Sequence, residues 1–367
     1  MPPSPHRPGV LAWQVFRGSD AIRQDLITEH QLRSSAWTRL RHDVYADSRL
    51  ARDHALACRA AALRLPPEAV VAGPSAAYLH GVAHAATFTD DVHVLVPRAM
   101  RLGPQRGLRV HSTGPTTPPR PPGRAGGPGS SSGPPAGGAG AAAHRPTDGT
   151  GLAARTSAGG MGVALRPPPG GLRVAELRTA GPPASTDPAG AAWETAVWLD
   201  PLRAVGIVDT LLRQGLTSRA ALADVADRNA DRPGGRRARW VFTLADPGAR
   251  SPAESELRTR LVLAGLPRPV ARHPVRVASG LLRYADLAWP AYRVAVAHAD
   301  PHAIVRGDPH AVAHGGPHTA AGHLEGIAQL VGAGWLVLPV TDRRLRQDFP
   351  GVLREVQAAL TVRGWRP

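Results

Sequence analysis

The segment Tyr284-Ala-Asp-Leu-Ala-Trp-Pro-Ala-Tyr-Arg-Val-Ala-Val296 predicts two β-strands joined by a turn, with Asp286 on the first strand. A metal-dependent phosphodiesterase needs several acidic side chains around Mg²⁺, commonly an Asp on one strand and a Glu or Asp on the next. Ala297 and Ala299 occupy the positions where the next strand would supply its acid. The segment therefore predicts a phosphodiesterase-like strand pair with an incomplete metal site.

The residues around this strand pair predict an α/β domain that spans residues 246–367. Ser251 and Pro252 mark the N-cap and first position of a helix that carries Glu254. The other predicted elements are strands over 275–278, 281–287 and 292–297, a helix over 320–331, a strand over 335–340 and a helix over 345–360. This order predicts helices packed on a mixed sheet.

Residues 10–50 predict a winged helix-turn-helix, with short helices over 19–24, 28–32 and 35–41 followed by a hairpin near residue 45. Four basic residues lie on or beside the third predicted helix and the wing, where DNA phosphates and groove edges would be met. These candidate DNA contacts are Arg33, Arg39, Arg41 and His42. The alternative is that any small three-helix unit of an Arg-rich protein shows such residues.

The rest of the chain predicts a small α+β middle module made of residues 51–111 and 171–245. Residues 112–170 interrupt it with a sequence rich in Pro, Gly, Ala, Ser and Thr. Such a segment buries too little apolar surface to offset its ordering entropy, so it is predicted to be a disordered insertion. The fold class is accordingly multi-domain, combining α/β and α+β parts.

Composition favours a nucleic-acid partner. The chain has 367 residues, a formal net charge of +16 and a pI near 11.5, and Arg-rich surfaces bind phosphates and release counterions. Double-stranded DNA is the expected partner. The chain contains no Lys, however, so its excess of Arg also fits GC-rich codon usage.

The absence of Lys also removes the strand Lys with which some nucleases position the attacking water. Cys58 is the only cysteine, which excludes an intramolecular disulfide and a zinc site built on several thiolates. The N-terminus lacks the apolar core of a signal peptide, and no run approaches the ~20 apolar residues of a membrane span. We therefore expect a soluble, cytoplasmic protein with no membrane partner.

The last third of the chain resembles the Vsr-like branch of the restriction-endonuclease-like superfamily. Four segments carry the resemblance: Ser251-Pro-Ala-Glu254, Ala285-Asp-Leu-Ala-Trp-Pro290, Arg293-Val-Ala-Val296 and Gly334-Trp-Leu-Val-Leu-Pro-Val-Thr341. The resemblance implies that Glu254 is the helix carboxylate of a nuclease site and that Asp286 is a metal-binding strand carboxylate.

The N-terminal half resembles the AbiEi-like antitoxins of type IV toxin–antitoxin systems, as found in actinobacteria. The resemblance is carried by Leu26-Ile-Thr28, Gln31-Leu-Arg33, Asp43-Val-Tyr45, Ser75-Ala-Ala77 and Leu79-His-Gly81. It implies a winged helix that binds promoter DNA and represses transcription, with a cognate toxin as a second partner.

The C-terminal segment departs from the nuclease pattern directly after Val296. The family typically continues there with Glu, an aromatic residue, an acid and Gly, whereas this chain has Ala297-His-Ala-Asp300. The resemblance therefore implies a degenerate nuclease domain, and no cofactor is expected. If the domain were active, Mg²⁺ would be its cofactor, with Asp286 and then Asp300 as ligands.

Three functions follow from these observations. The first is a DNA-binding transcriptional regulator or antitoxin-like protein with an inactive nuclease-like domain, and the second is a metal-dependent DNA endonuclease. The third is a decayed gene product damaged over residues 112–170 and 297–323, which an alternative reading frame restoring the lost motif would reveal. The second damaged stretch is rich in His, and a new metal site there is a further alternative, although its spacings fit no defined site.

Overall fold

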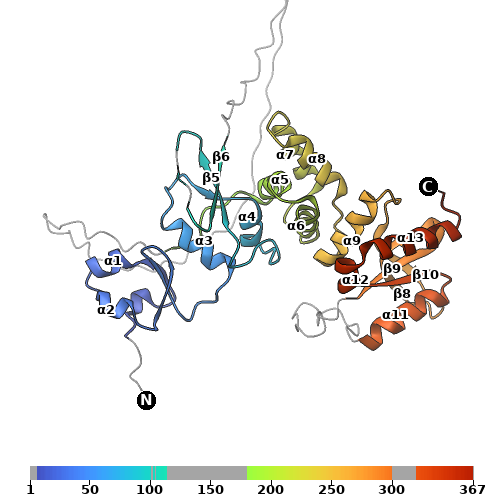
Figure 1. The fold of residues 1–367 in the computed structure, drawn as a ribbon, viewed down its shortest axis with the longest axis horizontal. Helices are drawn as coiled ribbons and strands as arrows, with labels where there is room; N and C mark the ends of the chain where they lie inside the picture. The colour runs from blue at the N-terminus through green and yellow to red at the C-terminus, as the bar shows by residue number, and fades with distance from the viewer. Residues whose placement is uncertain (1–5, 101, 104, 114–179, 300–319, 367) are drawn as a thin grey trace, which may run out of the picture. The chain divides into compact units, whose positions relative to one another are not determined.

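The computed structural model describes residues 6–100, 102–103, 105–113, 180–299 and 320–366. This part of the chain is mixed α/β, with three small sheets and helices between them (Figure 1). The predicted disordered insertion lies outside the described residues apart from Ser112 and Thr113, which end a strand. Asp300 and the His-rich residues up to 319 also lie outside them.

The N-terminal part is a three-stranded antiparallel sheet in the order β1-β3-β2, with two short helices. Its elements are η1 (Gly9–Leu11), β1 (Val15–Arg17), α1 (Gly18–Arg23), α2 (Glu29–Leu32), β2 (Trp37–Arg41) and β3 (Val44–Asp47). The rings of Phe16 and Trp37 meet edge to face in its core, 5.1 Å apart. Thr28 and Gln31 form a capping box, which confirms the predicted start of α2.

The third predicted helix, over 35–41, is wrong. These residues form strand β2, which pairs antiparallel with β3 and buries Trp37 against Phe16. Aromatic and β-branched residues such as Trp37 and Thr38 suit a pleated, half-buried surface, and the pairing with β3 decides between helix and strand. Arg33 thus caps the end of α2, while Arg39 and Arg41 lie on a strand. The winged helix-turn-helix assignment stays a prediction.

The middle part combines a three-stranded sheet, in the order β4-β5-β6, with a helical layer. Its elements are α3 (His54–Ala62), β4 (Val70–Val71), α4 (Gly73–Leu79), β5 (Val92–Pro97), β6 (Leu108–Thr113), α5 (Pro188–Trp198), α6 (Pro201–Arg213), α7 (Arg219–Arg228) and α8 (Gly235–Leu244). Ala77 and Val82 share one core with Val205 and Phe242. Segments on the two sides of residues 114–179 therefore fold together.

The C-terminal part is a four-stranded sheet in the order β10-β9-β8-β7. Its elements are α9 (Pro252–Leu263), β7 (Val270–Arg276), β8 (Leu282–Trp289), η2 (Pro290–Tyr292), β9 (Val294–Ala299), α11 (Ala320–Gly332), β10 (Leu336–Thr341), α12 (Asp342–Gln347) and α13 (Phe349–Val362). Strand β10 runs parallel to β9 while the other pairs are antiparallel, so the sheet is mixed, as predicted.

Helix α9 belongs to two cores at once. Leu257 and Leu261 pack in the core of the C-terminal sheet, whereas Arg258 faces α6 and forms a fully buried ion pair with Asp209, at 2.7 Å between Nη2 and Oδ2. The Arg258 guanidinium also donates to the carbonyl of Leu244. The helix that carries Glu254 is thereby anchored to the helical layer of the middle part.

Among the helices of the described residues, none has both the length and the apolar character needed to cross a membrane.

Candidate functional site

The structure brings the two predicted carboxylates together. Glu254 lies in the first turn of α9, which Ser251 caps, and Asp286 lies on β8. Glu254 is buried, and its Oε2 accepts a hydrogen bond from the backbone N–H of Arg250 at 2.8 Å. Burial, and then the charge of Asp286, raise the pKa of Glu254. Burial likewise raises the pKa of Asp286. Both shifts indicate carboxyls that hold protons more tightly than free side chains do.

Strand β9, which pairs with β8, places a backbone N–H and an imidazole ring near this pair, where a nuclease site would have a third carboxylate. Ala297 is buried on β9 and offers only a methyl group. The backbone N–H of His298 donates to Oδ2 of Asp286 at 2.8 Å. The ring of His298 is almost fully buried, and its Nε2 lies 2.9 Å from Oδ1 of Asp342. This is an ion-pair distance, although the two atoms are not aligned for a hydrogen bond.

Sequence reasoning missed Asp342 of this cluster, whereas His323 belongs to the His-rich stretch considered above as a possible metal site. Asp342 begins α12, directly after the N-cap Thr341, and reaches the cluster because β10 pairs in parallel with β9. His323 lies on α11, and its charge, like that of His298, opposes the rise in the pKa of Asp286. The cluster therefore contains three carboxyls and two imidazoles.

Of the predicted magnesium ligands, the structure describes Asp286, here beside Glu254, whereas Asp300 lies outside the described residues. Mg²⁺ takes oxygen ligands in near-octahedral geometry, and Ala297 contributes no oxygen. Within the ranges that the structure describes, no three His, Cys, Asp or Glu side chains are arranged to hold a metal ion.

The four candidate DNA contacts differ in their surroundings. Arg39 is exposed on the edge strand β2 and has no side-chain partner among the described residues. Arg33 is also exposed, with a 3.8 Å ion pair to Glu29. The Arg41 guanidinium donates to the carbonyls of Arg106 and Gly107, at 3.0 and 2.7 Å, and so ties β2 to the residues before β6.

His42 lies exposed in the turn between β2 and β3. Its carbonyl accepts a hydrogen bond from Nη1 of Arg64 at 2.8 Å, and its Nδ1 lies 3.2 Å from the same atom. These contacts fix the turn beside α3. Among the predicted DNA contacts, Arg33, Arg39 and His42 thus face solvent, while Arg41 has a structural role.

Comparison with known proteins gives two relatives. No family model matches the chain, and no solved structure matches it. Two curated proteins, each named "Uncharacterized protein" and found in two strains of Mycobacterium tuberculosis, are 30% identical to it over 185 residues. The match covers 49% of this chain and 62% of each relative, so the chain spans less than two thirds of the relatives' length. The chain is thus similar to these mycobacterial proteins over half of its own length.

Proposed function

We propose that this chain is a double-stranded-DNA-binding protein, a transcriptional regulator or antitoxin-like factor, whose C-terminal domain does not cleave DNA. The observation that carries the proposal is Arg39, an exposed guanidinium on the edge strand β2 with no partner in the described part of the chain, beside the exposed turn at His42. A β-hairpin with free basic side chains offers phosphate contacts of the kind that position proteins on DNA. The net charge of +16 adds non-specific attraction.

The C-terminal cluster supports the second half of the proposal. The strand next to Asp286 offers the methyl group of Ala297 where a metal site would need a further oxygen. Retention of Mg²⁺ and activation of water would require ionised oxygens at these positions. A fold of this kind can still contribute basic surface to a DNA complex.

Arg39→Ala is expected to weaken binding to duplex DNA and to reduce the slope of log K against log[salt] by about one. The reason is the loss of one phosphate contact from a side chain that has no structural partner among the described residues. Fluorescence anisotropy of a labelled duplex, titrated over roughly 50–200 mM salt, measures both quantities.

The matched control is Arg276→Ala. Arg276 is an exposed arginine on β7, likewise unpaired within the described residues, so its replacement removes the same charge from a different part of the chain. An equal loss of affinity in the two variants would show that net charge, and not the β2–β3 hairpin, controls binding. Arg41→Ala is a poorer test because it also breaks two structural hydrogen bonds.

A metal-dependent endonuclease is the second candidate, and the juxtaposition of Glu254 with Asp286 favours it. Our proposal predicts that supercoiled plasmid incubated with the full chain and Mg²⁺ or Mn²⁺ shows a mobility shift without nicking. Asp286→Ala should give the same pattern. Metal-dependent nicking that Asp286→Ala abolishes would instead establish the endonuclease.

A further inference from the structure

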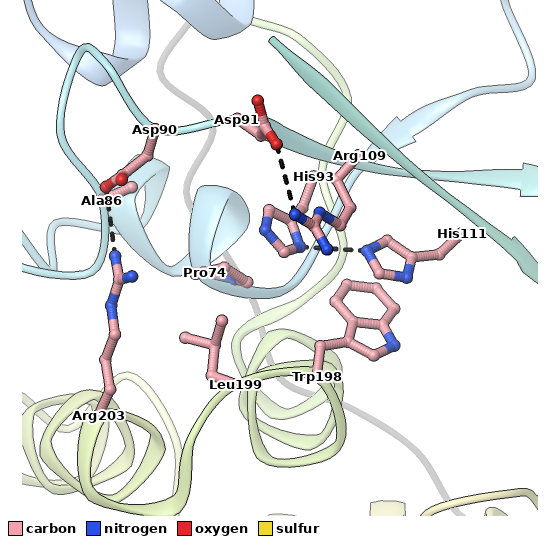
Figure 2. Close-up of a pocket in the computed structure, with 10 residues that line it drawn as sticks. All are labelled: Pro74, Ala86, Asp90, Asp91, His93, Arg109, His111, Trp198, Leu199 and Arg203. Carbon is pink, nitrogen blue, oxygen red and sulfur yellow. Dashed lines mark hydrogen bonds and ion pairs between the residues drawn. The ribbon is translucent and has the colours of Figure 1, made fainter. Parts of the chain in front are cut away.

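A cavity of about 340 Å³ lies in the middle part, where β5 and β6 face the end of α5 (Figure 2). Its wall on the strand side carries His93, His111 and Arg109, and Asp91 stands directly before β5. Trp198, the last residue of α5, closes the opposite side. None of these residues contributes to the carboxylate cluster or to the β2–β3 hairpin.

The alternation of β5 places its histidine in this cavity. Val92 and Val94 point into the core that α3 covers, whereas His93 points to the other face of the sheet. Parallel pairing sets His93 opposite Arg109 and Leu95 opposite His111. His93 and His111 are therefore diagonal neighbours on one face, and Asp91 precedes His93 by two residues, about 6.6 Å along the chain.

The two imidazoles are held in place. Nε2 of His111 and Nδ1 of His93 share a hydrogen bond at 3.1 Å. The ring of His111 stacks on Trp198 with 3.5 Å between centroids and 6° between planes. Trp198 in turn packs on Gly73, where φ is +54° and an added Cβ would lie 2.6 Å from the indole. Only a glycine allows this close approach at such a backbone angle.

Burial disfavours the protonated form of both rings. Burial, followed by the charge of His111, lowers the pKa of His93 to about 3, and burial followed by the charge of Arg109 lowers that of His111 to about 4.

We propose that His93 and His111 form a binding site for a divalent transition-metal ion of the Zn²⁺, Ni²⁺ or Cu²⁺ class, bound through Nδ1 and Nε2 respectively. If each nitrogen lay ~2.0–2.1 Å from one ion, their 3.1 Å separation would give an N–metal–N angle of about 100°. That value lies between octahedral and tetrahedral angles. Imidazole nitrogens favour these ions over Mg²⁺ or Ca²⁺.

The remaining ligands come from water or from Asp91. In the described residues no three donors are already arranged around one point, and Asp91 is turned toward Arg109, with a long 3.6 Å contact on a half-exposed side chain. Rotation of the Asp91 side chain toward His93 would add one carboxylate oxygen. The site is thus two imidazole nitrogens beside a cavity, and a bound ion would take the place of the proton that they share, which moves to another ring nitrogen or to solvent.

The test uses Ni²⁺ as the probe and the intrinsic fluorescence of Trp198 in the full chain. Ni²⁺ is paramagnetic and quenches an indole beside it, and Trp198 is stacked directly on the ligand ring of His111. Ni²⁺ is expected to quench a component of wild-type emission that Trp198→Phe lacks. Zn²⁺, which has a filled d shell, should displace Ni²⁺ and restore that emission.

His111→Phe is the decisive variant, because it keeps a flat ring on Trp198 and removes Nε2. We expect it to raise the apparent Kd for the quenching roughly tenfold or more, and to lower the number of Ni²⁺ equivalents in calorimetry by one. Histidines elsewhere, including those at 298 to 323, contribute equally to the calorimetry of both proteins. Unchanged quenching in His111→Phe would overturn the proposal. If that variant does not fold, His93→Asn must show the same loss.

Discussion

Asp209→Ala is expected to lower the free energy of unfolding by about 3–5 kcal/mol, because it leaves the buried guanidinium of Arg258 without its partner. The side chains of Arg258 and Asp209 are 0% and 1% exposed and lie 2.7 Å apart. Burial raises the pKa of Asp209, and the charge of Arg258 opposes that rise. Equilibrium unfolding in urea, followed by circular dichroism, measures the change.

Two controls separate this loss from a general effect of removing charge. Asp227→Ala breaks the exposed 3.0 Å ion pair with Arg239 and should cost less than about 1 kcal/mol. The double variant Asp209→Leu with Arg258→Met replaces the pair by apolar side chains and should be more stable than Asp209→Ala alone. A loss in Asp209→Ala no larger than in Asp227→Ala would contradict the structural role of the pair.

Stability should also depend on pH through Glu194. This side chain is buried on α5, where its Oε2 accepts hydrogen bonds from the N–H of Gly73 at 2.6 Å and from the hydroxyl of Thr186 at 2.8 Å. Burial raises its pKa from the ordinary 4.5 to about 7. Between these values the folded state binds more protons than the unfolded state, so stability falls as pH rises, by up to about 1.4 kcal/mol per pH unit.

Glu194→Gln removes this dependence because glutamine does not ionise. We expect the stability of the variant relative to wild type to increase by about 3 kcal/mol from pH 4 to pH 8, measured by urea unfolding at each pH. Buried histidines, whose pKa values are lowered, act in the opposite direction below pH 6.5, but they are common to both proteins and cancel.

A second substitution at the same position tests the hydrogen bonds of Glu194. Glu194→Ala leaves the buried N–H of Gly73 without its acceptor and should lower stability at every pH by about 1–3 kcal/mol. A difference between Glu194→Gln and wild type that stays constant from pH 4 to pH 8 would mean that Glu194 is not protonated in this window.

Much of the C-terminal part was predictable because its signals are local. Ser251 and Pro252 define the start of α9, and the predicted order of strands and helices appears with shifted ends, except that the helix predicted over 345–360 is divided at Asp348 into α12 and α13. The helix predicted over 35–41 was wrong because its true partner, β3, is set by pairing and by burial of Trp37. Local propensity alone does not contain that information.

The candidate site was predictable only where a motif carried it. Glu254 and Asp286 were found from sequence, and the structure places them together. Asp342 was not found, because only the parallel register of β10 on β9, with Val340 opposite His298, brings it to the cluster. His93 and His111 each follow a charged residue by two positions, and this spacing is visible in the sequence. Their proximity is not, because it depends on the pairing of β5 with β6.

The buried ion pair between Asp209 on α6 and Arg258 on α9 also limits which segment of the protein recombination can transfer to another protein. Recombination at the predicted boundary near residue 246 would deliver the C-terminal sheet with Arg258 but without Asp209. The transferred segment would place the buried guanidinium of Arg258 in the recipient protein without its carboxylate partner. A viable exchange must start upstream of α6, so the helical layer of the middle part and the C-terminal sheet are expected to evolve together.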